Sequence, residues 1–121
     1  MKSGNVPLGK EGERAAKEHL ISKGYEIVKE NYRFERAELD LIVKSEAKKI
    51  LVFVEVKTRR NKKFGEPEES VTEQKQNQLL KSAEGFLMTN PGWEDYEKRF
   101  DVIAIMADGE KLTINHIENA F

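Results

Sequence analysis

The sequence predicts an α/β protein in which helices flank a mixed β-sheet of about five strands. Three observations support this fold class. Two neighbouring segments alternate apolar and polar residues as strands do, and two other segments repeat apolar residues at helical spacing. A long connection through the second helix also separates the first strands from the last, which suits a crossover. The expected order is αβββαββ, and a chain of 121 residues is expected to form one domain spanning residues 1–121.

The first expected element is a helix over residues 8–23, because small and apolar side chains recur there every four positions. This row comprises Leu8, Gly12, Ala16 and Leu20. Gly24 is a natural end for the helix. The following segment, residues 25–34, is rich in aromatic and β-branched side chains and predicts a strand with an irregularity near Asn31.

Two alternating segments, residues 38–44 and 50–58, predict the next two strands. Alternation assigns Leu39, Leu41 and Val43 to one face of the first strand, opposite Glu38, Asp40, Ile42 and Lys44. On the second strand it groups Leu51, Phe53, Glu55 and Lys57 on one face. Acidic side chains are therefore expected beside large apolar ones.

The remaining segments predict a helix and a hairpin. Ser70 and Glu73 have the spacing of a capping box, and the apolar row that follows supports a helix ending before Asn90. A near-continuous apolar run at residues 100–106 predicts a buried strand. The Asp108-Gly109 turn signal then predicts that residues 112–117 return as its partner.

Composition excludes several classes of site. The chain has no cysteine, so thiolate metal sites and disulfides are excluded, and the two histidines, His19 and His116, are expected to be structural. No leader segment or membrane-spanning run is seen, so we expect a cytoplasmic protein without a membrane partner. A net charge of -1 argues against a surface that coats nucleic acid, although it leaves room for local contact.

The hairpin between the two alternating strands brings acids together. If the loop has two or four residues, paired positions sum to 95, so that Asp40 lies opposite Glu55 and Glu38 opposite Lys57. A three-residue loop would shift this register by one. Two carboxylates opposite each other repel. Either one of them takes up a proton, or a cation such as Mg²⁺, Mn²⁺ or Ca²⁺ lies between them.

Two alternatives remain open from the residues alone. The acids could belong to a ladder of cross-strand ion pairs on a solvated face, but their apolar neighbours Ile42, Leu51 and Phe53 indicate a face that is at least partly buried. Glu13 shares a helix side with Ala16 and Leu20, so it could be a third acid at the same site. Equally, it could remain at the helix start, where the macrodipole favours it.

These residues resemble the pattern of the PD-(D/E)XK nucleases. The resemblance rests on Glu13, on the Ala37-Glu-Leu-Asp-Leu-Ile42 segment and on Phe53-Val-Glu-Val-Lys-Thr-Arg59. Over nearly its full length, from Gly12-Glu13 through Arg99-Phe-Asp-Val102 to Ile117-Glu-Asn-Ala-Phe121, the chain is similar to the bacterial YraN family of endonuclease-like proteins. That family is related to archaeal Holliday-junction resolvases.

The resemblance implies a restriction-endonuclease-like core and a Mg²⁺-dependent endonuclease, with Mn²⁺ as an alternative ion, acting on DNA that includes branched or structured forms. Asp40, Glu55 and the Val56 carbonyl would bind the ion, Glu13 would contact the ion or its water, and Lys57 would orient the attacking water. Resolvase-like proteins often act as dimers, which suggests a homodimer. One departure is Ala37, since the family usually has glycine there; a positive φ at that position would strain alanine.

A basic stretch follows the proposed Glu55-Val-Lys57 motif, and this position favours a loop that guides phosphates over the alternative of a plain solvated loop. It comprises Arg59, Arg60, Lys62 and Lys63. Lys75 and Gln76, near the start of the second helix, could reach the same phosphate, although such side chains more often face solvent. We expect Asp101 to form a structural ion pair with Arg99 or another basic group. The alternative function is a non-catalytic nucleic-acid-binding or protein-interaction module that retains the nuclease fold.

Overall fold

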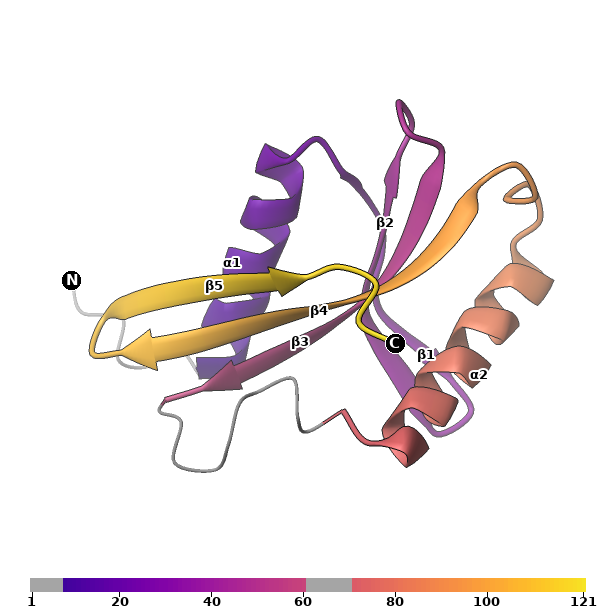
Figure 1. Ribbon diagram of the computed structural model, residues 1–121. Helices are drawn as coiled ribbons and strands as arrows, with labels where there is room; N and C mark the ends of the chain where they lie inside the picture. The colour runs from indigo at the N-terminus through magenta and orange to yellow at the C-terminus, as the bar shows by residue number, and fades with distance from the viewer. Residues whose placement is uncertain (1–7, 61–70) are drawn as a thin grey trace.

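The computed structural model describes residues 8–60 and 71–121, with seven elements in the order αβββαββ (Figure 1). The helices are α1 (Leu8–Ser22) and α2 (Glu73–Thr89). The strands are β1 (Glu26–Phe34), β2 (Ala37–Ser45), β3 (Ile50–Arg59), β4 (Glu97–Asp108) and β5 (Lys111–Ile117). The expected α/β class and element order are confirmed.

The five strands form one mixed sheet in the order β1-β2-β3-β4-β5. Only β3 and β4 run parallel, because α2 carries the chain between them, and the other neighbours are antiparallel. The expected crossover is therefore confirmed. Two-residue turns give tight antiparallel hairpins, as at Gly109, which adopts a φ of 65° between β4 and β5.

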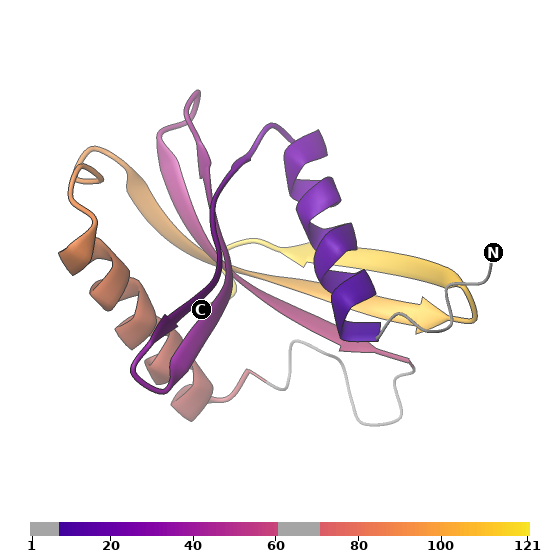
Figure 2. The same cartoon turned by 180° about the vertical axis from the view of Figure 1, so that it is seen from behind.

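The sheet divides into two arms where β2 and β3 cease to pair, beyond Leu41 and Val54 on the side away from their hairpin loop. Figures 1 and 2 show the β1–β2 ribbon diverging from β3, β4 and β5, with α2 beside the first arm and α1 beside the second. The backbone ladder between β2 and β3 accordingly ends at the pair Leu41 and Val54. The side chains at this point of divergence include the predicted acidic residues.

Two apolar clusters hold the helices against the sheet. One cluster joins Ala16 and Leu20 of α1 to fully buried residues such as Val43 and Val54. The other joins Leu79 and Phe86 of α2 to a second set of sheet residues, among them Phe53. Since alternate residues of a strand face opposite sides, one sheet serves both clusters.

The alternation predicted for β2 fails at its centre. Leu41 packs in the α1 cluster, whereas Leu39 packs in the α2 cluster together with Tyr32 of β1. On β1, Asn31 adopts a φ of 51°, which confirms the expected irregularity there. In the β1–β2 register, Glu30 pairs with Leu41 and Tyr32 pairs with Leu39, but Asn31 and Asp40 between them are not paired. The side chains of β2 before and after Asp40 therefore do not follow one alternation.

The backbone tests two local predictions. The N-cap of α2 is Thr72, whose hydroxyl accepts a hydrogen bond from the Lys75 N–H at 3.2 Å, so the predicted Ser70–Glu73 capping box is wrong in its cap. Ser70 itself lies outside the described residues. Ala37 is not among the described residues with positive φ; the left-handed conformation falls on Glu35 in the preceding turn, with φ 56°. Ala37 is therefore unstrained.

Neither described helix is long and apolar enough to cross a membrane.

Candidate functional site

The acidic site lies where β2 and β3 separate. The predicted register is correct for the five pairs from Leu41–Val54 to Ser45–Ile50, whose positions all sum to 95. It does not continue to Asp40 and Glu55. Instead, Asp40 Oδ2 accepts a hydrogen bond from the Val56 N–H at 2.7 Å, so a side chain takes the position of a ladder carbonyl. This insertion accounts for the end of the pairing.

Asp40 is held in an environment that disfavours its charge. Burial raises the pKa of its carboxyl to about 7, and the charges of Glu55, Glu13 and Glu38 add to the effect, while the Val56 hydrogen bond opposes it. The expected repulsion between neighbouring acids is thus present. Near neutral pH, protonation of Asp40 reduces it. A cation at this position would remove the need for that proton.

Glu55 is stabilised by lysines. Its side chain is only 6% exposed, and its Oε2 lies 3.5 Å from Lys57 Nζ and 3.6 Å from Lys75 Nζ. Lys57 comes from the same strand, and Lys75 comes from the first turn of α2. Lys75 therefore belongs to the acidic site. From the sequence alone, a solvent-facing side chain is the more frequent outcome for a lysine at such a position.

The predicted pairing of Glu38 with Lys57 does not occur. Glu38 Oε2 instead lies 3.7 Å from Arg33 Nη2, because β1 and not β3 faces it beyond the end of the β2–β3 ladder. Both side chains of this pair are substantially exposed. Lys57 forms its ion pair with Glu55 instead.

Glu13 approaches the site from α1. It is half-buried, and it is close enough for its charge to raise the pKa of Asp40. Its position depends on Gly12, because a Cβ at Gly12 would lie 2.3 Å from Thr58 Oγ1 on β3. The missing side chain lets the start of α1 lie directly on the end of β3. This brings Glu13 to the Asp40 side.

The acids do not form a complete ligand set by themselves. Within residues 8–60 and 71–121, no three His, Asp or Glu side chains are grouped closely enough to hold a metal ion. Two carboxylates and a backbone carbonyl are nevertheless a usual protein contribution to a Mg²⁺ site, because Mg²⁺ keeps several waters and often binds substrate phosphates. The oxygen donors of Asp40, Glu55 and Val56 fit that kind of site.

The other predicted binding residues have different outcomes. Arg59 is half-buried and Arg60 is exposed at the end of β3, beyond Lys57. Lys62 and Lys63 lie outside the described residues. The amide of Gln76 donates to the Val71 carbonyl at 3.2 Å, at the start of its own helix, and so is engaged away from the acids.

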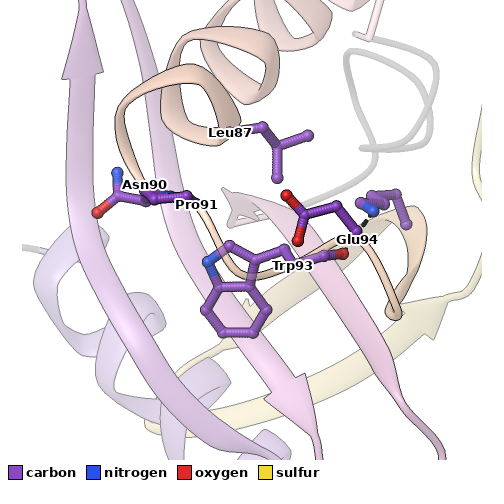
Figure 3. A pocket seen from close by; sticks show the side chains of 6 residues that line it. Leu87, Asn90, Pro91, Trp93 and Glu94 are labelled. Atoms are coloured by element: carbon purple, nitrogen blue, oxygen red, sulfur yellow. Dashed lines mark hydrogen bonds between the residues drawn. The ribbon is translucent and has the colours of Figure 1, made fainter.

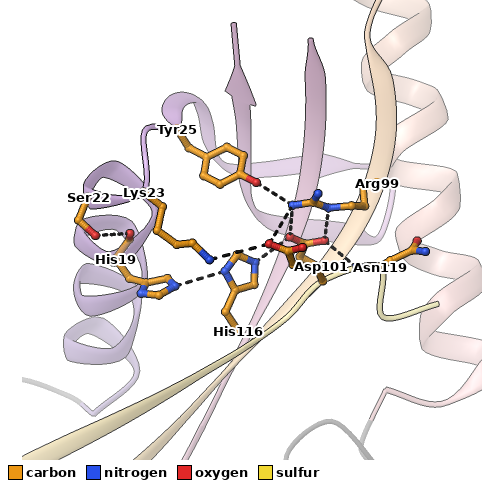
Figure 4. A network of polar contacts seen from close by, with 9 residues as sticks. His19, Ser22, Lys23, Tyr25, Arg99, Asp101, His116 and Asn119 are labelled. Atoms are coloured by element: carbon orange, nitrogen blue, oxygen red, sulfur yellow. Dashed lines mark hydrogen bonds and ion pairs between the residues drawn. The ribbon is translucent and has the colours of Figure 1, made fainter. Parts of the chain in front are cut away.

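A second polar network, which sequence reasoning largely missed, lies between α1, β4 and β5 (Figure 4). The expected Arg99–Asp101 pair is confirmed, with two contacts of 2.9 Å. His116 Nε2 lies 2.7 Å from Asp101 Oδ2, and His116 Nδ1 lies 3.2 Å from His19 Nε2. Arg99 also donates to the Tyr25 hydroxyl at 2.7 Å. Nothing in local spacing could predict contacts between histidines 97 residues apart.

This network favours particular charge states. Burial raises the pKa of Asp101, but hydrogen bonds from His116, Arg99 and the Asn119 N–H outweigh it and hold that pKa below its ordinary value. Burial, His116 and Lys23 lower the pKa of His19. The network therefore combines an ionised Asp101 with a His19 that resists protonation.

A separate small cavity of about 110 Å³ lies near the start of β4, beside Trp93 (Figure 3). Its lining also includes Leu87, Pro91 and Lys98. Lys98 donates to the Trp93 carbonyl at 2.6 Å, and Lys44 Nζ lies 5.9 Å from the indole centroid. Lys98, the cation in the lining, is thus engaged by the Trp93 carbonyl, and none of the predicted acidic residues lines the cavity.

Comparisons with known proteins identify relatives over almost the whole chain. A protein from Chloroherpeton thalassium is 46% identical over 88% of this chain and 81% of its own length. One from Natranaerobius thermophilus is 44% identical over 97% of this chain and 98% of its own. Both are described as UPF0102 proteins.

Among solved structures, the chain resembles the SPO1766 protein of unknown function from Silicibacter pomeroyi, at 16% identity and a TM-score of 0.42. That likeness covers 94% of this chain and 75% of the other. The family model described as "Uncharacterised protein family UPF0102" matches residues 12–105, a range that includes Glu13, Asp40, Glu55 and Lys57. The chain belongs to the UPF0102 family.

Proposed function

We propose that this protein is a metal-dependent endonuclease of the PD-(D/E)XK type, YraN-like, that hydrolyses phosphodiester bonds in DNA. The observation that carries the proposal is the pair of neighbouring acids at the separation of β2 and β3, in which Glu55 is buried and Asp40 is half-buried. Asp40 has a pKa of about 7 there because Glu55, Glu13 and Glu38 add their charges to its burial. A site with this excess of negative charge favours a divalent cation.

Asp40, Glu55 and the Val56 carbonyl would hold the ion, and Glu13 would contact it or its water. When bound, Mg²⁺ or Mn²⁺ would neutralise phosphate charge and lower the pKa of an attacking water. The protein supplies two fixed carboxylates, with Asp40 anchored by the Val56 N–H at 2.7 Å. Such anchoring limits the reorganisation that the site needs during reaction.

Two lysines provide the complementary charge. Lys57 and Lys75 both approach Glu55 Oε2, at 3.5 Å and 3.6 Å, from a strand and from the first turn of α2. A phosphate entering this side would meet both ammonium groups. Lys57 would orient the water and steady developing charge, and Lys75 would hold a nonbridging oxygen.

The surface around the acids suits a polyanion on one side. Arg59 and Arg60 follow Lys57 at the end of β3 and add positive charge there. Contacts of this kind fix the position of a nucleic-acid strand without reading its sequence. The modest net charge of -1 is then compatible with local binding.

The second candidate function is a binding module that retains this architecture without cutting. It is favoured by the two lysines, because they already compensate Glu55, and by the lack of three grouped acidic or histidine side chains among the described residues. In this alternative the same lysines and arginines bind nucleic acid with no ion required.

The test is cleavage of a DNA panel by the purified protein with Mg²⁺ or Mn²⁺. The panel contains single-stranded, nicked, flapped and four-way DNA, and each substrate is also incubated with chelator. We expect metal-dependent cleavage of at least one substrate, reduced by about 100-fold or more in Asp40→Asn and Glu55→Gln.

Glu84→Gln is the matched control, because it removes the same charge from an exposed position of α2. It should cut as the wild type does. Cleavage that persists in Asp40→Asn would indicate a contaminating nuclease. Tight binding of the panel without any cleavage, unaffected by chelator, would favour the binding module.

A further inference from the structure

A hollow of about 260 Å³ lies between the β1–β2 turn and α2, on the arm of the sheet that carries Asp40. Figures 1 and 2 both show this turn beside α2. The hollow is lined by Phe34, Glu35, Arg36, Ala37, Gln78 and Lys81. No function described above uses these residues, and none of them was singled out in the sequence as a binding residue.

The lining combines positive charge, an amide and an aromatic ring. Arg36 is exposed and makes no ion pair with the described part of the chain. Lys81 Nζ lies 3.8 Å from Glu35 Oε1, but the two side chains are 65% and 62% exposed. This ion pair is therefore weak, and another anion can replace Glu35 as the partner of Lys81. Counting Arg36, Lys81 and Glu35, the hollow has a net positive charge.

Phe34 packs closely against α2. A Cβ at Gly85 would lie 2.3 Å from Phe34 Cδ1, so the ring lies directly on the backbone of α2. The ring is only half-buried, and it lines the hollow. A packed aromatic ring beside an exposed guanidinium is the chemistry that binds a base and its phosphate.

The distance from the acidic site can be measured along two elements. From Ala37 to Asp40 is three residues of β2, or about 10 Å at strand spacing. From Lys75, which contacts Glu55, to Gln78 is three residues of α2, or about 4.5 Å along the helix axis, and these positions share one side of the helix. Each of these path lengths is comparable to the spacing of one or a few nucleotides, so one strand could contact the acids and the hollow together.

We propose that this hollow binds one unpaired nucleotide of the strand whose phosphate meets Asp40 and Glu55. The base would stack on Phe34, the phosphate would pair with Arg36, and Gln78 would contact the edge of the base. The inference rests on the proposed function and adds a substrate class: nucleic acid with an unpaired nucleotide beside the cut. Bases within a duplex are stacked on both faces and cannot enter.

The test uses binding in chelator, which separates it from cutting. Fluorescence anisotropy compares a labelled oligothymidylate with a fully paired duplex of the same length. Arg36→Ser should weaken single-strand binding by about fivefold or more and duplex binding by less than about twofold. The matched control is Lys48→Ser, which removes an exposed cation at the β2–β3 turn; both affinities should be retained.

A second measurement uses the wild-type protein. An oligonucleotide containing 5-iododeoxyuridine is irradiated on the protein, and the cross-linked peptide is identified by mass spectrometry. Cross-linking at Phe34 by an unpaired iodouracil supports the subsite. Cross-links only elsewhere, or equal losses for single strand and duplex in Arg36→Ser, would overturn it. Competition by an acidic peptide at least as strong as that of the oligothymidylate would assign the hollow to protein instead.

The two proposals fail in different ways. Metal-dependent cleavage that Arg36→Ser leaves unchanged would overturn the subsite and leave the endonuclease intact. Cross-linking at Phe34 in a protein that cuts nothing would retain the subsite and favour the binding module.

Discussion

At the scale of single residues, Asp40 has two roles that oppose each other. Its carboxylate accepts the Val56 N–H at 2.7 Å, which favours the charged form. Burial and three neighbouring acids favour the neutral form more strongly, so its pKa rises to about 7. The site is thus destabilised above neutral pH unless a cation is bound.

Replacing Asp40 with asparagine should stabilise the metal-free protein. The folded pKa of Asp40, about 7, exceeds its ordinary value of 3.8, so its stabilising contribution is full below pH 4 and is lost as the pH rises through 7. Asparagine stays neutral, and its oxygen can still accept the Val56 hydrogen bond. At pH 8 in chelator we expect Asp40→Asn to raise the free energy of unfolding by on the order of 2 kcal/mol.

Urea denaturation at pH 4, 6 and 8 measures this change. The difference between variant and wild type should grow with pH. Equal stability at all three values would show that Asp40 is charged in the folded state without cost.

Lys75 should weaken metal binding while it supports reaction. Its ammonium lies 3.6 Å from Glu55 Oε2, where it repels a divalent ion. In Lys75→Met, which keeps the length of the side chain, Mn²⁺ should bind about threefold more tightly or better, and cleavage should fall by about 10-fold or more. Isothermal calorimetry and the cleavage assay measure the two effects.

Lys81→Met, on the same helix but paired with the exposed Glu35, is the control for Mn²⁺ affinity. Weaker Mn²⁺ binding in Lys75→Met than in the wild type would contradict a competition between this lysine and the ion.

At the scale of elements, the contact of α1 with β3 determines whether Glu13 reaches the site. A Cβ at Gly12 would lie 2.3 Å from Thr58 Oγ1. Helix propensity alone would make Gly12→Ala stabilising by about 1 kcal/mol. We expect the opposite sign, a loss of about 1–3 kcal/mol, because the helix must move away from the strand.

Thermal unfolding of Gly12→Ala, Thr58→Ala and the double variant tests this contact. The double variant should recover most of the loss, since Thr58→Ala removes the hydroxyl and methyl that the new Cβ would meet. A stabilised Gly12→Ala would mean that α1 does not lie closely on β3.

The network between α1 and β5 should make stability depend on pH. Burial, His116 and Lys23 lower the pKa of His19 below 6.5, so the unfolded chain binds more protons and stability falls as the pH drops below about 6.5. Other charged groups facing this network are Asp101, Arg99 and Glu118, and the first two stay ionised.

His19→Gln removes this titration. Between pH 7.5 and pH 5, the wild type should lose more unfolding free energy than the variant in matched urea titrations. Parallel losses would show that His19 titrates equally in the folded and unfolded chain.

The elements differ in how far the sequence could predict them. The β2–β3 register followed from the position of the hairpin loop alone, since local turn geometry fixes pairing. The separation of the strands at Asp40 did not, because it depends on a side chain replacing a backbone acceptor. The prediction that Leu39 shares a sheet face with Leu41 is also wrong. Strict alternation fails beside Asn31, a residue of the neighbouring strand with a left-handed conformation.

Contacts between distant segments limited the prediction of the site. The approach of Lys75 to Glu55 depends on how α2 packs against the sheet, and helical periodicity does not predict that packing. The meeting of His19 with His116 depends on the order of all five strands. In contrast, the grouping of Asp40 with Glu55 needed only one hairpin, and it was predictable for that reason.

At the scale of the whole molecule, the two arms of the sheet give the site its character. Each arm carries one helix, and both helices begin near the separated strands, with Glu13 on α1 and Lys75 on α2. Acids gather at the junction of the arms, and cations lie along β3, α2 and the β1–β2 turn. Under the proposed function, a nucleic-acid strand would contact both sets.

The most direct test of the central claim, that this junction is a divalent metal site, is a calorimetric titration of the full chain with Mn²⁺ at pH 8 and pH 6. We expect one ion per chain, bound more weakly at pH 6 because protonated Asp40 must first release its proton, and no binding by Asp40→Asn or Glu55→Gln. Wild-type protein that binds no Mn²⁺ at either pH, alone or with oligonucleotide present, would contradict the account.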